Sequence, residues 1–437
     1  MRPDKIGLTK TLSFVIANII GVGVFTSLGF QLMETQNVIT ILSLWIIGGV
    51  VALSGSLVYG ELGASMPRSG GEYHYLSKIY HPFIGFLSGW TSLTVGFAAP
   101  VALACMALGK YFHSVVPSFS PTAIALTALC FLSILHSFNI RFGGLFQRAI
   151  TFSNIILIFV FIICGLIFIP KFQDVSGSFT SFSLNEFMKP AFVISLIYVY
   201  YAFSGWNASA YIAGDIENPQ KVIPKSLFMS AVLVTLLYVL LNFTFLLTTP
   251  ASALKGQLEV GYISATYIFG MNGGILFSIL ISIILISSVS SMIFIGPRVS
   301  QVMGEDYKLL KFLSVRTLKG TPIIGLWLQF VISFILIITS SFETVMTYTG
   351  FTLNLFTFLA VMGIFVHRYK YKNIERPYKT WGYPYTPIIF LLIMLWTLSY
   401  LMFTRWQESL LGFFTIFCGS IIYYLNNFVF DKKVIKN

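Results

Sequence analysis

Residues 17–25, Ala17-Asn18-Ile19-Ile20-Gly21-Val22-Gly23-Val24-Phe25, lie about halfway along the first long apolar segment of the chain. The two glycines weaken an α-helix at this point, because each Gly costs about 1 kcal/mol relative to Ala. A second weak point, Ser204-Gly205-Trp206-Asn207, lies at a comparable depth in a later apolar segment. Glycine that packs between membrane helices would explain either point alone. Their positions relative to each other, considered below, indicate more.

The composition assigns the chain to a lipid bilayer. Of 437 residues, 56% are hydrophobic and 10% are charged, whereas soluble domains carry about 25% charged residues. The net charge of +12 comes from basic residues in short connections, where they set membrane orientation, so we expect no nucleic-acid partner. The first apolar stretch continues beyond signal-peptide length without a cleavage site, and we expect it to be retained as a span.

Polar interruptions divide the chain into apolar segments of the length that a spanning helix needs, about 20 residues. Such long continuous segments exclude a transmembrane barrel, whose strands alternate in polarity. We therefore expect an all-α polytopic membrane protein with one transmembrane domain, 1–437. The twelve predicted spans are residues 9–33, 38–65, 82–112, 121–138, 145–169, 189–214, 225–248, 264–298, 322–340, 344–367, 384–403 and 409–429.

The basic residues predict the orientation. Of the 27 Lys and Arg residues, 22 fall on one side of this arrangement and 5 on the other, namely Lys110, Lys171, Lys189, Lys255 and Arg405. The positive-inside rule then places both termini in the cytoplasm, as an even number of spans also requires. The expected location is the plasma (inner) membrane.

The two weak points occupy matching places in two blocks of five helices. Gly21 and Ser204 lie 183 residues apart, each in the first span of its block, and the second block starts on the opposite side because five is odd. Paired interruptions in inverted repeats indicate a mid-membrane binding site in secondary transporters. We assign residues 9–169 to the first repeat (helices 1–5), 189–367 to the second (helices 6–10) and 384–429 to two extra helices.

Unwinding a helix exposes backbone groups that suit a zwitterion. Amide groups near Val22 and Gly23 would face a carboxylate at a helix N-terminus, and the freed carbonyls of Ile19 and Ile20 would face an ammonium group. Helix 6 offers a second set around Tyr201, Phe203 and Ser204. An α-amino acid carries both charges and is the predicted ligand, and glycine permits the close approach.

Four longer motifs accompany these breaks: Ile20–Phe25, Tyr59–Tyr73, Phe203–Asn207 followed by Glu217–Pro224, and Gly296–Asp306. Together they resemble the signatures of an amino acid permease of the amino acid, polyamine and organocation superfamily, nearest its L-type branch. The resemblance implies a LeuT-like fold, with five plus five inverted helices and two more at the end. It also implies alternating access of one small solute.

The resemblance further implies which residues bind the substrate. The helix 1 loop of relatives corresponds to Ile20, Gly21, Val22 and Gly23. The helix 6 bend corresponds to Tyr201, Ser204 and Gly205, with Tyr201 or Trp206 as a candidate gate. For these two aromatic residues ordinary helix packing is the alternative, since 16% of the chain is aromatic.

Two departures from the family concern coupling ions and partners. Many relatives have a helix 5 lysine where Asn154 stands here. Asn154 either packs helices or forms a sodium site with Ser290, Ser291 and helix 1 carbonyls, so Na⁺ and H⁺ both remain candidate coupling ions, and no other cofactor or metal is expected. Residues 113–121 lack the cysteine that joins L-type members to a heavy chain, so we expect a monomer without a disulfide-linked partner.

Glu61 lies near the inner end of helix 2. A membrane carboxylate is a functional candidate by default. We expect it to pair with Arg68 or Arg141, or else to take part in proton coupling or gating.

No nucleophile or metal motif of a membrane enzyme occurs in the sequence, and no ring of polar residues indicates a channel. The prediction is a secondary active transporter of an α-amino acid. A neutral substrate is favoured, because the helix 1 and 6 residues offer no carboxylate to a buried cation. The alternatives are a cationic amino acid or polyamine transporter or exchanger, and a sensor that does not transport.

Overall fold

The computed structural model describes residues 5–138, 144–168, 173, 183–318 and 320–431. These residues form helices, with one isolated bridge between Ile6 and Ile216. The α-helices are α1 Leu8–Ile19, α2 Val22–Glu34, α3 Val38–Ser65, α4 Glu72–Ile79, α5 Pro82–Thr91, α6 Ala98–His113, α7 Pro121–Ser137, α8 Gly144–Ile167, α10 Pro190–Phe203, α11 Ala208–Tyr211, α12 Pro219–Thr248, α13 Ala251–Leu254, α14 Val260–Asp306, α15 Ile323–Thr339, α16 Phe342–Lys370, α17 Tyr385–Thr404 and α18 Trp406–Asp431.

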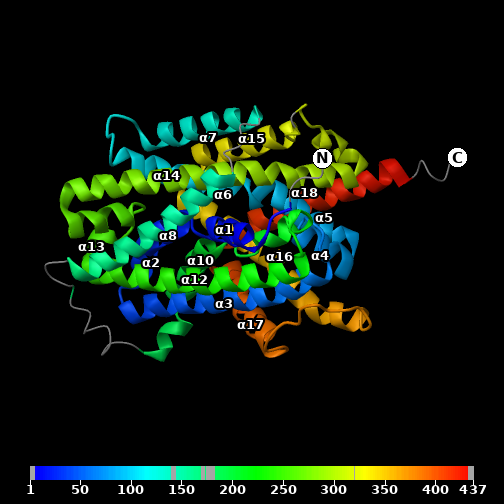
Figure 1. The fold of residues 1–437 in the computed structure, drawn as a ribbon, viewed down its shortest axis with the longest axis horizontal. Coiled ribbons are helices and arrows are strands. Elements are labelled where there is room, and N and C mark those ends of the chain that lie inside the picture. Colours follow the sequence, from blue (N-terminus) through cyan, green and yellow to red (C-terminus); the bar gives the residue numbers. More distant parts are fainter. Residues whose placement is uncertain (1–4, 139–143, 169–172, 174–182, 319, 432–437) are drawn as a thin grey trace.

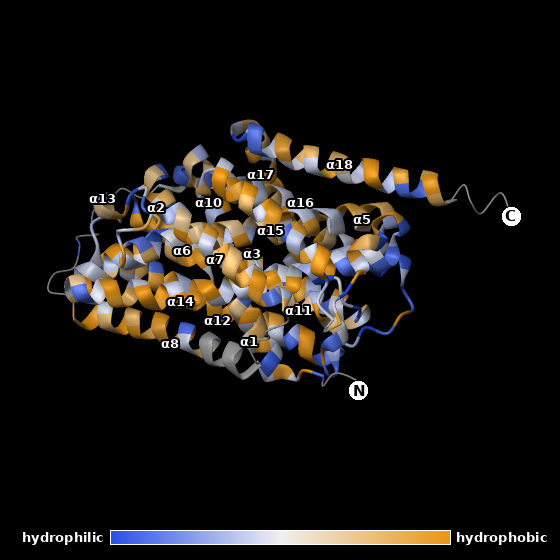
Figure 2. Ribbon diagram, turned by 90° about the horizontal axis from the view of Figure 1, so that it is seen from above, coloured by the Kyte–Doolittle hydropathy of each residue, from blue (hydrophilic) through white to orange (hydrophobic). Residues whose placement is uncertain are grey.

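Eight helical segments among the described residues are long and apolar enough to cross a membrane, with α1–α2 and α5–α6 each counted as one segment. Four shorter apolar helices lie on the other predicted spans: Pro121–Ser137, Phe152–Ile167, Pro190–Phe203 and Ile323–Thr339. Figure 2 shows hydrophobic residues along the helices and hydrophilic residues mainly toward their ends. The prediction of an all-helical, multi-pass membrane protein is confirmed, while twelve crossings and the orientation remain predictions. The tails 1–4 and 432–437, and the basic residues Arg141, Lys171 and Lys319, lie outside the described residues.

Local sequence signals set several helix starts. The side chains of Asn37, Ser120 and Ser341 cap α3, α7 and α16 by accepting a backbone N–H three residues later. Such caps satisfy one of the amide groups that the first helical turn leaves free. Pro82 and Pro190 occupy the first turns of α5 and α10, where a missing N–H costs nothing.

The helices that contain the two sequence breaks pack together. Helix α10 lies against α2 and α3, and α12 lies against α1 and α3. Helix α14 packs against α6 and α15, and the long helices α3, α12 and α14 are prominent in Figure 1. Helix α18 lies at the edge of the bundle (Figure 2). Central helices therefore surround both breaks.

Besides the two spans that contain the breaks, two more predicted spans differ from simple helices. Helix α14 extends beyond the predicted 264–298 to 47 residues, with a bend at Gly270, whose φ is 75°. The predicted span 82–112 consists of α5, a π-helical turn at Ser92–Gly96 and α6. A π turn inserts an extra residue into a helix and occurs frequently at functional sites.

Candidate functional site

The first helix is interrupted at Ile20 and Gly21. Helix α1 ends at Ile19 and α2 begins at Val22. Ile20 is extended, with φ −73° and ψ 97°, and Gly21 has φ −144° and ψ −144°. This interruption lies where the two glycines predict it.

The second interruption is longer. Helix α10 ends at Phe203 and α11 begins at Ala208. Gly205 has φ 91°, a conformation that L side chains rarely adopt. A Cβ atom at this position would also lie 2.4 Å from the carbonyl oxygen of Asn18. Both the backbone conformation and the close approach to α1 therefore require glycine at position 205.

The two interruptions lie side by side. A Cβ at Gly23 would lie 2.3 Å from the Cα of Ala202, so α2 and α10 touch through their backbones. The Tyr238 hydroxyl of α12 lies 2.8 Å from the Ile19 carbonyl oxygen and 3.2 Å from that of Ala202. Because a hydroxyl has one proton, the two carbonyls share this donor. Carbonyls released by both breaks are thus partly satisfied within the protein.

A cavity of about 120 Å³ lies beside the second interruption. Ser204, Gly205, Trp206 and Asn207 form one part of its wall, and Asn18 of α1 faces it as well. Ser204, Gly205 and Asn207 are half-buried, as expected of residues that border a hollow. The second break therefore has free space beside it.

Three other helical regions complete the cavity wall. The α5 and π-helical region contributes Ser88, Thr91 and Ser92, α14 contributes Met292 and Ile295, and α16 contributes Asn354 and Thr357. These residues were not predicted from the sequence. The signal that could have found them is a group of hydroxyl and amide side chains within apolar segments. Several of these side chains are three or four residues apart, a spacing that places them on one helix face.

The predicted substrate residues fall into two groups. Ser204, Gly205 and the gate candidate Trp206 line the cavity. The remaining predicted residues are buried and do not line it: Ile19, Ile20, Gly21, Val22, Gly23, Tyr201 and Phe203. The ring of Trp206 lies edge-on to that of Tyr59, with centroids 4.8 Å apart. Contact with substrate, and a gating role for Tyr201 or Trp206, remain predictions.

Glu72 is a cavity residue that sequence analysis missed. Glu72 is the first residue of α4 and is buried, with a relative exposure of 4%. Oε1 accepts hydrogen bonds from the Tyr59 hydroxyl at 2.7 Å and from Nδ2 of Asn207 at 2.6 Å. Oε2 accepts from the Tyr211 hydroxyl. One carboxylate thus joins α3, α4 and the segment that follows the second break.

The segment around Glu72 also contacts the end of α14. The Tyr73 hydroxyl donates to Oδ2 of Asp306 at 2.5 Å, and Arg68 lies 3.6 Å from Oδ1. Burial and the Asp306 carboxylate raise the pKa of Tyr73. Burial, together with Arg68 and Lys78, lowers the pKa of His74 to about 4. The His74 ring is therefore neutral at pH 7.

A family model described as amino acid permease matches residues 6–424 of the chain. The chain belongs to this family. A permease is a transporter and not an enzyme, and membership implies a LeuT-like fold. The resemblance inferred from the four motifs is thereby confirmed.

Several characterised permeases are similar along nearly the whole chain. The b(0,+)-type amino acid transporter 1 of Mus musculus is 28% identical over 438 residues, 98% of this chain and 88% of that protein. The serine/threonine exchanger SteT of Bacillus subtilis (strain 168) is 28% identical over 431 residues, 96% of each chain. The cystine/glutamate transporter of Homo sapiens is 26% identical over 437 residues, 98% of this chain and 86% of that protein.

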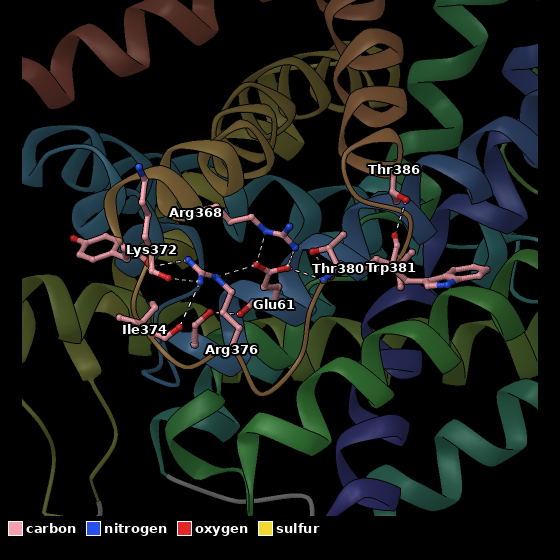
Figure 3. Close-up of polar contacts among 11 residues, drawn as sticks. Glu61, Arg368, Lys372, Ile374, Arg376, Thr380, Trp381 and Thr386 are labelled. Carbon is pink, nitrogen blue, oxygen red and sulfur yellow. Dashed lines mark hydrogen bonds and ion pairs between the residues drawn. The ribbon is translucent and has the colours of Figure 1, made fainter.

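In this permease Glu61 is the centre of a second buried polar cluster (Figure 3). Arg368 donates to both carboxylate oxygens, at 2.9 and 2.6 Å, and the Thr380 backbone N–H donates to one at 2.6 Å. Nε of Arg376 lies 3.5 Å away. The expectation that Arg68 pairs with Glu61 is wrong, because Glu61 pairs with Arg368 near the end of α16 and with Arg376 in the connection that follows, while Arg68 lies beside Asp306. The other expected partner, Arg141, lies outside the described residues.

The proposed sodium ligands of the permease are placed as follows. Asn154 is buried and its Oδ1 has no hydrogen-bond partner among the described residues. Ser290 lies 2.8 Å from Nε2 of His136, and Ser291 is half-buried. The α14 hydroxyl beside the first break belongs to Ser288, 3.3 Å from where a Cβ of Gly21 would lie. A sodium site at Asn154, Ser290 and Ser291 therefore remains a prediction.

Proposed function

We propose that the protein is a secondary active transporter that moves a neutral α-amino acid across the plasma (inner) membrane by alternating access. The observation that carries the proposal is the cavity beside Ser204 and Gly205 in a chain of the amino acid permease family. The unwound backbone between α1 and α2 and between α10 and α11 is proposed to hold the carboxylate and amine of the substrate. The two five-helix inverted repeats, 9–169 and 189–367, and cytoplasmic termini belong to the same proposal.

The charges of the cavity wall support a substrate without a negative side chain. Among the described residues that line it, there is no Lys, Arg or His. An acidic side chain would therefore be buried without a counter-charge, which costs several kcal/mol. The hydroxyl and amide groups of Ser88, Thr91, Asn354 and Thr357 suit a neutral polar or small side chain instead.

A cationic amino acid is the second candidate, and Glu72 is the observation that favours it. The neutral substrate was predicted because the residues of the two breaks offer no carboxylate. The cavity wall extends beyond the breaks and includes Glu72. Three neutral groups already donate to this carboxylate, so a cation would compete with them. We therefore rank the neutral substrate first.

Purified protein in proteoliposomes tests the proposal. Uptake of radiolabelled serine, alanine, leucine, lysine and glutamate is measured against protein-free vesicles. We expect uptake of neutral amino acids, weaker uptake of lysine and none of glutamate. Preferred uptake of lysine would support the second candidate. A thermal shift on adding an amino acid, without uptake, would indicate a sensor and contradict the transport proposal.

The coupling mode is measured in the same vesicles. Stimulation by unlabelled amino acid inside the vesicle indicates exchange, whereas stimulation by an inward Na⁺ or H⁺ gradient indicates symport. A sodium site at Asn154, Ser290 and Ser291 requires a sodium effect that Asn154→Ala removes. If the protein is a monomer without a disulfide-linked partner, protein extracted from the membrane should migrate equally in denaturing gels with and without reductant.

A further inference from the structure

Asn207 is the residue of the second break that connects the cavity to Glu72. It lies directly before α11 with φ −90° and ψ 7°, and it lines the cavity together with Glu72. Its Nδ2 donates to Oε1 of Glu72 at 2.6 Å. The proposed capture of carboxylate and amine by unwound backbone uses neither side chain.

The chemistry of the pair fixes the orientation of the Asn207 amide. A carboxylate only accepts hydrogen bonds, so the amide must direct its NH₂ group toward Glu72. The amide oxygen is then the group that Asn207 can offer as an acceptor to the cavity that it lines. Hydrogen bonds to a charged acceptor are about twice as strong as neutral ones. Glu72 therefore holds the amide in one of its two orientations.

Glu72 is itself held in place from two sides. The hydroxyls of Tyr59 on α3 and Tyr211 on α11 both donate to its carboxylate. The backbone N–H groups of Gly70 and Gly71 donate to the carbonyls of Tyr211 and Ala210, each at 3.3 Å. The carboxylate and the short helix after the break thus form one connected unit.

We propose that Glu72 is a positioning residue for substrate selection, acting through Asn207. By binding the amide nitrogen, it presents the Asn207 oxygen to the cavity as a hydrogen-bond acceptor. The site then prefers amino acids whose side chain carries a donor, such as a hydroxyl, over apolar side chains of the same shape. This inference rests on the proposed transport of amino acids through the cavity.

Glu72→Gln tests the inference. It removes the negative charge, so the Asn207 amide can rotate by half a turn and exchange the positions of its oxygen and its NH₂ group. The measured quantity is the ratio of kcat/KM for serine over alanine, and for threonine over valine, in proteoliposomes. We expect both ratios to fall about two- to tenfold, the value of one neutral hydrogen bond. The change in KM for the hydroxyl amino acid should exceed any change in KM for alanine. Asn207→Ala should lower the ratios equally, and the double variant should lower them no further.

Tyr59→Phe is the matched control, because it removes another donor to Oε1 of Glu72 and leaves the bond to Asn207. Because Tyr211 still donates to the carboxylate, this variant should change the ratios less than Glu72→Gln does. Unchanged ratios in Glu72→Gln would overturn this inference and leave the proposed function standing. So would a double variant in which the effects of Glu72→Gln and Asn207→Ala multiply. If wild-type protein takes up no amino acid, the proposed function fails and the inference with it. If Glu72→Gln does not fold, Glu72→Asp replaces it. The shorter side chain moves the carboxylate away from Asn207 by the length of one methylene, and the same kcat/KM ratios are compared.

Discussion

The two helix breaks look alike in the sequence but face different surroundings. The break at Ile20 and Gly21 is buried on all sides, and the neighbouring Ile19 carbonyl is bonded to Tyr238. The break around Gly205 contains a left-handed residue and borders the cavity. In this conformation the first break is a contact between helices, and the second is part of a wall. Equivalent sequence signals therefore do not imply equivalent exposure to substrate.

Gly205→Ala should have the largest effect. The substitution places a side chain at φ 91° and 2.4 Å from the Asn18 carbonyl oxygen. The backbone strain alone is worth about 1–3 kcal/mol, and the clash adds to it. We expect loss of uptake and little folded protein in fluorescence-detected size-exclusion chromatography. Gly350→Ala is the control, since its new Cβ would meet a single Ile197 methyl at 3.1 Å. Wild-type melting and uptake for Gly205→Ala would contradict the need for glycine.

Gly23→Ala should rank second. Its Cβ would lie 2.3 Å from a backbone atom, the Cα of Ala202, so α2 and α10 must separate. Overpacking of this kind costs about 1–3 kcal/mol. We expect a lower melting temperature and reduced uptake, measured on the same purified protein. A variant that melts like the wild type would show that the two breaks are not held together by this contact.

Tyr238→Phe should destabilise the protein more modestly, because it affects one shared hydrogen bond. Removing the hydroxyl leaves the Ile19 and Ala202 carbonyls without this donor, at a cost near the lower end of the range of about 1–3 kcal/mol for unsatisfied buried groups. We expect a lower melting temperature with the substrate specificity retained. Phe203→Leu, a change on the same packed surface without a polar group, serves as control. A change in specificity would indicate that the freed Ile19 carbonyl contacts the substrate.

Gly21→Ala should have the smallest effect on stability. Its Cβ would lie 3.3 Å from Oγ of Ser288, and that side chain can move. We expect a change below about 1 kcal/mol, which Ser288→Ala should reverse. Loss of uptake at normal stability would mean that substrate approaches the Gly21 backbone closely. The first break would then be a ligand surface like the second, and the comparison between them would fail.

The sequence predicted the parts of the fold that depend on local signals. The apolar segments located the helices. Gly21 and Gly205 located both interruptions because glycine weakens a helix, although the glycines of α3 leave that helix continuous. The π-helical turn at Ser92–Gly96 was missed, since no residue there differs from an ordinary apolar helix. Glu72 and the partners of Glu61 were missed because their contacts join segments far apart in the chain. Only the folded backbone brings Asn207 to Glu72, or Arg376 to Glu61.

Helix α17 is attached at both ends to other helices. At one end, the Thr380 N–H, just before the helix, binds the Glu61 carboxylate of α3. At the other end, Arg405 lies 2.5 Å from Glu343 at the start of α16, and the Tyr198 hydroxyl of α10 donates to the same carboxylate. A tilt of α3 and α10 would therefore carry α17 along as long as these contacts hold. The lipid in contact with α17 would then be displaced in every transport cycle. A more viscous bilayer would therefore lower the rate of transport.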